Sequence, residues 1–332
     1  MQNITLRTQS LTIGYKSGNQ SICLFEDLSL QLQQQQLVCF MGPNGAGKST
    51  LIRTLAGLQE PLRGKVEILA DPHPISTSAT VDVAHSIAVV LTDRIATNNL
   101  TVRDLVTFGR YPYLDWTIRL HQRDDELITK AIAEVNIEYL EEKKIFELSD
   151  GQLQMVMIAR ALAQDTPIIL LDEPTAHLDL NNRIEIMKTL KHLTRKKNKT
   201  VLLATHDLDL ALQTADAIWL TGKNKNILTG IPEDLVLNGM FDSIFEFKGF
   251  DLKTGKVIHT SFQKFNVKLS GQGHFFLWTK NALERTGYRL DPDADLEIST
   301  PETEELLWKI FYQGNLKEVT SISDLLNHLQ TI

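Results

Sequence analysis

A glycine-rich segment carries the clearest chemical pattern in this sequence. Residues 42–49 read Gly-Pro-Asn-Gly-Ala-Gly-Lys-Ser and fit G-x-x-x-x-G-K-[ST], with an apolar strand before and a helix after. Glycines let successive backbone N–H groups face a phosphate chain, and the lysine adds a point charge. We therefore predict that a nucleotide's phosphates are bound by Gly42, Pro43, Asn44, Gly45, Ala46, Gly47, Lys48, Ser49 and Thr50, with the Ser49 hydroxyl as a Mg²⁺ ligand.

Two acids and a histidine follow further apolar strands. Asp172 and Glu173 come directly after Ile-Ile-Leu-Leu, and His206 follows Val-Leu-Leu-Ala-Thr. Open α/β sheets bind ligands at the carboxyl ends of their strands. We expect Asp172 to hold Mg²⁺ through water and Glu173 to act as the general base that polarises the attacking water. Together with Lys48, His206 is a catalytic candidate, as a donor to the γ-phosphate.

A second helix start that could attract an anion lies in the stretch ELSDGQLQMVMIARALAQ. Ser149, Asp150 and Gly151 precede an apolar helical pattern, and the free N–H groups of a helix start favour negative charge. One chain thus has one complete phosphate loop and one further helix start. An isologous dimer, in which each helix start meets the partner's nucleotide, would use both.

The surrounding pattern predicts the elements that hold these residues. Residues 1–70 are typical of strands, and residues 99–147 of helices. The segments LVCFM, PIILLDEP and TVLLATHD read as buried strands flanked by helices, which indicates a largely parallel sheet. We predict an α/β domain over residues 1–235, with a mixed sheet and a helical subdomain at about 95–165.

The chain changes character near residue 231, and over half of its aromatic residues lie after residue 240. Residues 247–262 suggest a hairpin, and a later helix has Ser321 or Ser323 as its cap. We predict a separate small α+β accessory domain over residues 241–332, with a regulatory or dimer-stabilising role as its functional alternative to simple packing.

Composition excludes several classes of protein. The chain has 332 residues, 42% of them apolar, and a net charge of -7, which argues against binding of nucleic-acid backbone. No apolar run reaches the roughly 18 residues of a membrane span, and the start lacks a signal pattern, so we expect a cytosolic chain. Cys23 and Cys39 are expected to be reduced core residues, and Trp278 and Trp308 to be core aromatics.

Taken together, the motifs resemble the nucleotide-binding subunits of ABC (ATP-binding cassette) transporters. GPNGAGKST, LSDGQ, ILLDEP, AHLD and His206 occur in that family's order, over about residues 1–235. The resemblance implies a P-loop NTPase fold of ABC type and hydrolysis of ATP with Mg²⁺. It also implies two copies stacked head to tail, each capping the partner's ATP with a signature motif formed here by Ser149, Asp150, Gly151 and Gln152.

Three positions need comment beside that family. Asp150 replaces a glycine of the signature Leu-Ser-Gly-Gly-Gln, and we expect its carboxylate to turn away from phosphate and cap its own helix. The resemblance places Asp179 on the dimer seam, with a simple turn residue as the alternative. It places Tyr15 against adenine, with a packing role in the core or on the surface as the alternative.

A glutamine that meets Mg²⁺ and the attacking water is usual in the family. Here the aligned residue is Thr92, with Asp93 as the other possible substitute, and the sequence does not choose between them.

The segment from Leu100 to Tyr113 resembles the iron-siderophore, haem and vitamin B12 uptake subfamily, in which Gly-Arg-Tyr-Pro docks on the permease. This implies an exposed groove rich in Tyr and Arg, unless Tyr111, Pro112 and Tyr113 merely end a helix. The implied partners are a second copy of the chain, integral permease subunits and, indirectly, a substrate-binding protein, with no nucleic acid. The implied location is peripheral, on the cytoplasmic face of the inner membrane.

Other functions remain open at this point. A non-transport ABC-type ATPase on ribosomes or DNA usually carries two cassettes or a long coiled coil, and neither pattern is present in this sequence. An exporter ATPase is a further alternative. A P-loop kinase would not explain LSDGQ or His206.

Overall fold

The computed structural model describes residues 3–18, 20–69, 75–76, 80–91, 99–222, 225–245, 250–252, 256–257, 265–301 and 306–331. Its contacts divide the chain into two units, Met1–Glu246 and Phe247–Ile332. Each unit has its own cluster of buried apolar side chains. None of the described helices combines the length and apolarity that a membrane crossing requires.

A six-stranded sheet forms the centre of the first unit, in the order β11-β10-β4-β9-β8-β7. The strands are β4 (Leu37–Met41), β7 (Ile87–Val90), β8 (Ile168–Asp172), β9 (Thr200–Ala204), β10 (Ala217–Thr221) and β11 (Ile227–Gly230). Neighbouring strands pair in parallel except β11, which runs antiparallel to β10. The predicted buried strands of a largely parallel sheet are therefore confirmed.

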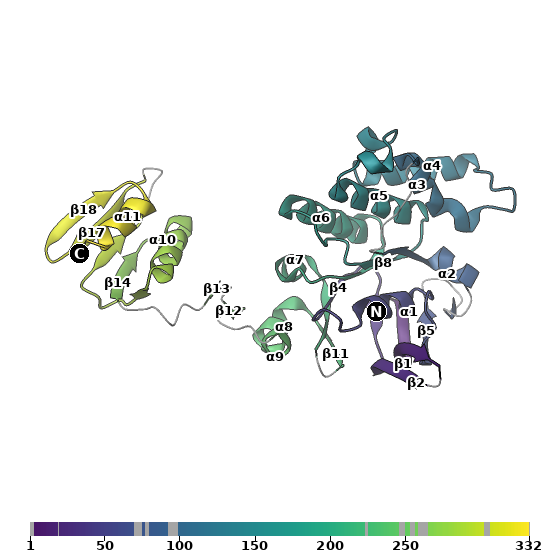
Figure 1. Ribbon diagram of the computed structural model, residues 1–332, viewed down its shortest axis with the longest axis horizontal. Helices are drawn as coiled ribbons and strands as arrows, with labels where there is room; N and C mark the ends of the chain where they lie inside the picture. The colour runs from purple at the N-terminus through teal and green to yellow at the C-terminus, as the bar shows by residue number, and fades with distance from the viewer. Residues whose placement is uncertain are drawn as a thin grey trace. The chain divides into compact units, whose positions relative to one another are not determined.

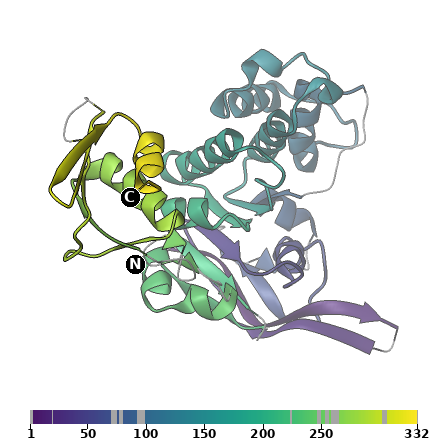
Figure 2. The same ribbon diagram turned by 60° about the vertical axis from the view of Figure 1, so that its left-hand side comes forward.

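An antiparallel sheet lies beside it in the order β2-β1-β5-β6, with β3 paired to β1. Its strands are β1 (Ile4–Ser17), β2 (Gln20–Leu28), β3 (Gln31–Gln33), β5 (Arg63–Ile68) and β6 (Ile75–Ser76). Figure 2 shows β1 and β2 as a long purple ribbon. This sheet makes the first unit's sheet system mixed, as predicted.

Helices connect and cover these sheets. Around the parallel sheet lie α1 (Lys48–Leu55), α2 (Thr80–Ser86), α6 (Leu180–Lys196), α7 (Leu208–Thr214), α8 (Pro232–Leu237) and α9 (Met240–Phe245). The helical region holds α3 (Val102–Thr107), α4 (Gln122–Glu134), α5 (Asp150–Ala163) and short 3₁₀ segments at Phe108–Tyr113, Glu138–Leu140 and Ile145–Glu147. In Figure 1 this region gathers at one end of the first unit, with β1, β2 and β5 at the other.

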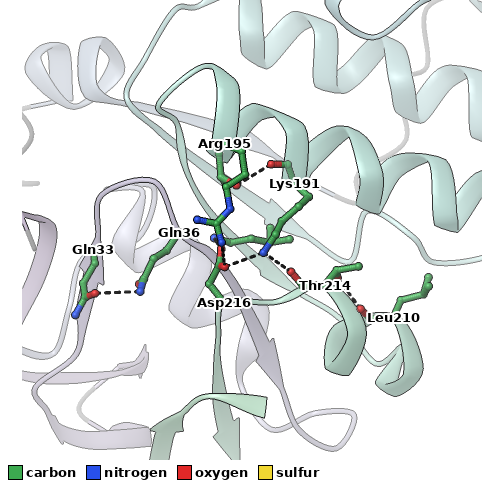
Figure 3. Close-up of polar contacts among 9 residues, drawn as sticks. Gln33, Gln36, Lys191, Arg195, Leu210, Thr214 and Asp216 are labelled. Carbon is green, nitrogen blue, oxygen red and sulfur yellow. Dashed lines mark hydrogen bonds and ion pairs between the residues drawn. The ribbon is translucent and has the colours of Figure 1, made fainter. Parts of the chain in front are cut away.

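Asp216, just before β10, ties the last turns of α6 to the parallel sheet (Figure 3). Its Oδ1 lies 2.7 Å from Lys191 Nζ and 2.5 Å from Arg195 Nη2, and its Oδ2 accepts a 2.9 Å bond from the Leu37 backbone N–H. Lys191 Nζ also donates to the Thr214 carbonyl at 2.8 Å. A single carboxylate thus joins the end of α6 to the starts of β4 and β10.

The second unit is a small α+β domain, as predicted. Its main sheet has the order β15-β14-β16-β17-β18. The elements are β14 (Phe265–Ser270), α10 (Gly273–Arg285), β15 (Tyr288–Leu290), β16 (Glu297–Ser299), β17 (Trp308–Tyr312), β18 (Asn315–Val319) and α11 (Ile322–Leu329). The expected hairpin is present as β12 (Phe250–Asp251) paired antiparallel with β13 (Lys256–Val257).

Single residues of the second unit test finer predictions. Ser321 is the cap of α11, because its hydroxyl accepts the Asp324 N–H at 3.1 Å. Trp308 is buried and donates to Thr279 Oγ1 at 2.7 Å. Trp278 was predicted as core, and this is wrong: its side chain is 64% exposed, whereas the buried residues of α10 are Thr279, Ala282 and Leu283.

Candidate functional site

The loop between β4 and α1 is shaped for a phosphate chain. Gly45 and Gly47 have φ angles of 77° and 96°, a region that residues with a Cβ rarely adopt. Gly47 is the N-cap of α1 and has no side chain to offer its first turn. The first N–H groups of α1 therefore face the loop without a side-chain acceptor from the cap, which is the arrangement that favours an anion.

Lys48 supplies positive charge inside this loop. Its side chain is buried, and Nζ donates to the carbonyls of Gly42 at 3.0 Å and Pro43 at 3.2 Å. The same ammonium lies 3.8 Å from Glu173 Oε1. The loop carbonyls hold the cation at the carboxyl end of β4, where the predicted phosphate position lies.

Ser49 and Asp172 form an oxygen pair across the site. Ser49 Oγ donates to Asp172 Oδ1 at 3.0 Å. Burial raises the pKa of Asp172, and the bond from Ser49 opposes that rise. No described group of three His, Cys, Asp or Glu side chains could hold a metal alone. The Ser49 hydroxyl, which is exposed, and the Asp172 carboxylate, which is buried, are both hard oxygen ligands. Such a pair fits Mg²⁺, which usually completes its coordination shell with phosphate oxygens and water.

Glu173 stands at the strand end between the Lys48 ammonium and the His206 ring. It has a left-handed φ of 49°, and its N–H donates to the Ala204 carbonyl at 3.0 Å, which fixes it beside β9. Glu173 Oε2 lies 3.6 Å from His206 Nδ1, whereas Lys48 Nζ is near the other carboxylate oxygen, Oε1. A carboxylate held between an ammonium and an imidazole is placed to orient and deprotonate a water.

These residues line one pocket with a volume of about 790 Å³. The lining comprises Tyr15, Leu24, Asn44, Gly45, Gly47, Lys48, Ser49, Thr50, Asp172, Glu173, Ala176, His177 and His206. Leu24, Ala176 and His177 were not predicted from the sequence. His177 lies in the AHLD segment, two residues before Asp179, and this position in a family motif is the sequence signal that could have identified it.

Tyr15 borders this pocket from the antiparallel sheet. Its hydroxyl lies 2.6 Å from Thr50 Oγ1, and half of the side chain, 50%, is exposed. The bond to α1 fixes the ring at the rim, where a flat base could stack on it.

The signature residues lie at the start of α5 and do not appear among the described residues that line the pocket. Ser149 caps the helix, because its hydroxyl accepts the Gln152 N–H at 3.3 Å, and Gln152 Oε1 accepts the Ser149 N–H at 3.1 Å. The prediction that Asp150 caps the helix is wrong: Asp150 is the first helical residue, and Ser149 has the extended conformation that a cap needs. Gly151 is buried at the same end.

Asp179 is exposed and caps α6 through the Asn182 N–H, 2.9 Å from its Oδ1. Thr92 and Asp93 lie outside the described residues, so the metal contact expected there stays a prediction.

Comparison with known proteins fits this geometry. Residues 25–176 match the ABC transporter family, and residues 264–330 match the iron ABC transporter C-terminal domain. An uncharacterised ABC transporter ATP-binding protein of Methanocaldococcus jannaschii is 40% identical over 243 residues, which are 73% of this chain and 82% of that protein. The chain belongs to the ATP-binding proteins of ABC transporters.

Further relatives of this ABC ATPase have named transport roles. The petrobactin import ATP-binding protein FpuD of Bacillus anthracis is 36% identical over 73% of this chain and 87% of its own length. The ferric enterobactin transport ATP-binding protein FepC of Escherichia coli is 35% identical over 72% and 86%. A dimeric ATP-binding cassette in a post-hydrolysis state, bound to ADP and Pi, has a TM-score of 0.59 and 28% identity, and the match covers 68% of this chain and 98% of that one. The chain is thus an ATP-hydrolysing subunit of this family.

The Gly-Arg-Tyr-Pro segment of this ABC ATPase differs from expectation. Arg110 was predicted in an exposed groove, and this is wrong: it is buried, with Nε 2.9 Å from Asp124 Oδ1 and Nη1 2.9 Å from the Ala163 carbonyl. Its guanidinium also lies 3.9 Å from the ring centre of Tyr113. Arg110 therefore fastens the segment to α4 and α5, while the exposed side chains nearby are Tyr111, Tyr113, Trp116, Ile118 and Leu120.

Proposed function

We propose that this ABC ATPase energises the import of an iron chelate of the siderophore type. One observation carries the substrate class: the cassette is followed by a match to the iron ABC transporter C-terminal domain. The names of relatives from Bacillus anthracis and Escherichia coli, a petrobactin and a ferric enterobactin system, support the same class. Haem and cobalamin, expected from the subfamily resemblance, have no such support among these names.

In the proposed mechanism, ATP lies in the 790 Å³ pocket with its adenine on Tyr15 and its phosphates on the loop and the first turn of α1. Lys48 neutralises the β/γ-phosphates. Ser49 and, through water, Asp172 would hold Mg²⁺, which supplies charge neutralisation to the phosphates when bound, and Thr92 or Asp93 would add to that set.

Glu173 is the proposed general base. Its carboxylate takes the proton of the attacking water. His206, whose Nδ1 lies 3.6 Å from Glu173 Oε2, orients that carboxylate and donates toward the γ-phosphate. General-base assistance of this kind contributes typically about 10²–10⁴-fold in rate.

The complete site is proposed to need two copies. Ser149, Gly151 and Gln152 would close on the partner's γ-phosphate, with Asp179 on the seam, because the described lining of the chain's own pocket contains none of them. The dimeric ADP-bound relative supports this arrangement. Binding of ATP would then favour association of the two copies, and hydrolysis would let the copies separate.

The permease contact is proposed at the exposed face around Tyr111 and Trp116, which are 52% and 92% exposed. This would place the chain peripherally on the cytoplasmic face of the membrane, with permease subunits as direct partners and a binding protein as an indirect one. The second unit is proposed as an accessory domain that regulates or stabilises the dimer.

A Glu173→Gln variant tests the reaction and the transport role together. In detergent-solubilised complex we expect bound ATP to be retained, a stable ATP-dependent dimer by light scattering, and turnover reduced by about 10²-fold or more. Cells carrying only this variant should fail to take up iron-55 as a ferric siderophore, while cobalamin uptake stays normal. Normal iron uptake with lost cobalamin uptake, or co-purification with ribosomes and no integral permease, would contradict the proposal.

A further inference from the structure

The first turn of α6 lies against the start of the signature helix α5 at one point. A Cβ built on Gly151 would fall 2.6 Å from Asn182 Cγ and 2.7 Å from Asn182 Nδ2. Such distances are far inside ordinary contact, so the Asn182 amide fills the space that a side chain at 151 would take. A Cβ at position 151 would therefore have to displace the Asn182 amide, while the backbone at Gly151 has no positive φ that would itself demand glycine.

The same amide also holds the cap of α6. Asn182 Nδ2 donates to Asp179 Oδ2 at 3.0 Å, and the Asn182 N–H donates to Asp179 Oδ1 at 2.9 Å. Both carboxylate oxygens of Asp179 are therefore engaged by one residue. One side chain, half-buried, touches the signature glycine on one side and orients the Asp179 cap on the other.

The rest of α6 is anchored to the sheet and to the chain's own catalytic loop. Arg183, the next residue, lies 2.7 Å from Asp207 Oδ2, and Asp207 follows His206 and caps α7. At the other end, Lys191 and Arg195 hold Asp216 (Figure 3). The helix α6 is thus anchored at both ends, and Asn182 in its first turn is the residue that meets Gly151 of α5.

We propose that Asn182 is a positioning residue of the ATPase cycle. Its amide locks the signature motif and the Asp179 cap of one protomer into a single rigid unit, which presents both to the partner's nucleotide in a fixed geometry. The inference rests on the proposed two-copy reaction centre. It adds a connection within one chain, from the elements that serve the partner's ATP to the loop carrying its own His206.

Asn182→Ala tests the lock, and Asn181→Ala is the matched control, because Asn181 is the same residue type one position away and is exposed. In full-length protein carrying Glu173→Gln, we expect Asn182→Ala to weaken ATP-dependent dimerisation by about 10-fold, measured by light scattering against protein concentration. ADP affinity by calorimetry should stay unchanged, since Asn182 is not in the lining of the pocket. Asn181→Ala should match the parent in both measurements.

A double-variant cycle separates the lock from simple destabilisation. Gly151→Ala should push the amide off Asp179, so adding Asn182→Ala to it should cost nothing further in dimerisation. Losses that add independently would overturn the proposal, and so would equal dimerisation by Asn182→Ala and its parent. Absence of any ATP-dependent dimer in the Glu173→Gln parent would instead overturn the proposed function.

Discussion

Two helix starts in this molecule are proposed to meet phosphate, and their chemistry differs. The start of α1 has a left-handed glycine as its cap, no acid in its first turn and a buried lysine. The start of α5 has a serine cap whose hydroxyl and backbone are already paired with Gln152, and an acid, Asp150, as its first residue. The start of α1 leaves its N–H groups and a positive charge for a ligand. At the start of α5, some of the backbone N–H groups are already bonded within the chain.

This difference fits the proposed division of roles between the two helix starts. A site that must hold a multiply charged phosphate chain by itself needs free donors and net positive charge, as at α1. A site that only meets a nucleotide already held by another copy, as we propose for α5, can keep its own cap and a weaker field. The comparison predicts that changes at α1 abolish binding, while changes at α5 alter association and leave monomer binding intact.

The largest effect is expected at α1. Lys48→Ala should lower nucleotide affinity by about 100-fold or more, because a charge-assisted contact inside the loop is lost, as measured by calorimetry with ATP and ADP. Lys191→Ala, which removes a lysine on α6 away from the pocket, is the control and should bind ADP normally. Unchanged affinity in Lys48→Ala would remove the distinction between the two starts.

A smaller effect is expected at the cap of α5. Ser149→Ala should leave ADP binding unchanged but weaken the ATP-dependent dimer of Glu173→Gln protein by about 10-fold, because the partner's γ-phosphate loses a hydroxyl donor. The lost cap should also cost about 1 kcal/mol of stability. Ser321→Ala, which removes the equivalent cap of α11, provides the control for the stability term alone. Equal dimerisation in both variants would mean that α5 does not meet a nucleotide.

The field at α5 can be adjusted through Asp150. Asp150→Asn should strengthen ATP-dependent dimerisation by about 2–5-fold, because one negative charge near the incoming phosphates is removed. The gain should shrink as salt is raised, since the charge is exposed. A weaker dimer would indicate that the carboxylate makes a favourable contact in the closed state.

The smallest effect concerns the stability contribution of Asp172, at the end of β8 and bonded to Ser49 of α1. Burial raises the pKa of Asp172 above its ordinary value, so its charged form is disfavoured in the folded protein. At a pH below both pKa values the group is protonated in both states and costs nothing; as pH rises through the window between them, folding loses stability. Asp172→Asn should therefore raise the melting temperature at neutral pH but not in acid, while Mg²⁺-dependent ATPase activity is lost. The same melting temperatures at both pH values would contradict this.

Short contiguous motifs allowed the site to be predicted. The phosphate loop, Asp172, Glu173 and His206 each follow an apolar strand directly, so the strand order alone brings them to one edge of the sheet. The alternation of buried strands and helices similarly predicted the fold class. These inferences needed only local sequence and the known geometry of parallel sheets.

Contacts between distant segments could not be predicted in this way. The burial of Arg110 depends on Asp124 and on the Ala163 carbonyl at the end of α5. The exposure of Trp278 depends on which face of α10 packs against the rest of its unit. By contrast, the engagement of Gln152 by Ser149 follows the pattern of a capping box, S-x-x-Q, which is a local sequence signal. The packing of Asn182 on Gly151 depends on the approach of two helices and has no local signal.

Gly42 has a consequence for reading related sequences. A Cβ there would fall 2.5 Å from Thr221 Cγ2 and 2.7 Å from the Thr221 carbonyl oxygen, at the end of β10. By contrast, a Cβ on Gly45 would meet nothing within 4 Å, so only its backbone conformation restricts that position. The first glycine thus serves the packing of the sheet as much as the ligand. A decayed gene copy that no longer needs ATP would keep Gly42 for folding long after Gly45 and Lys48 had drifted, so that glycine by itself is poor proof of a working enzyme.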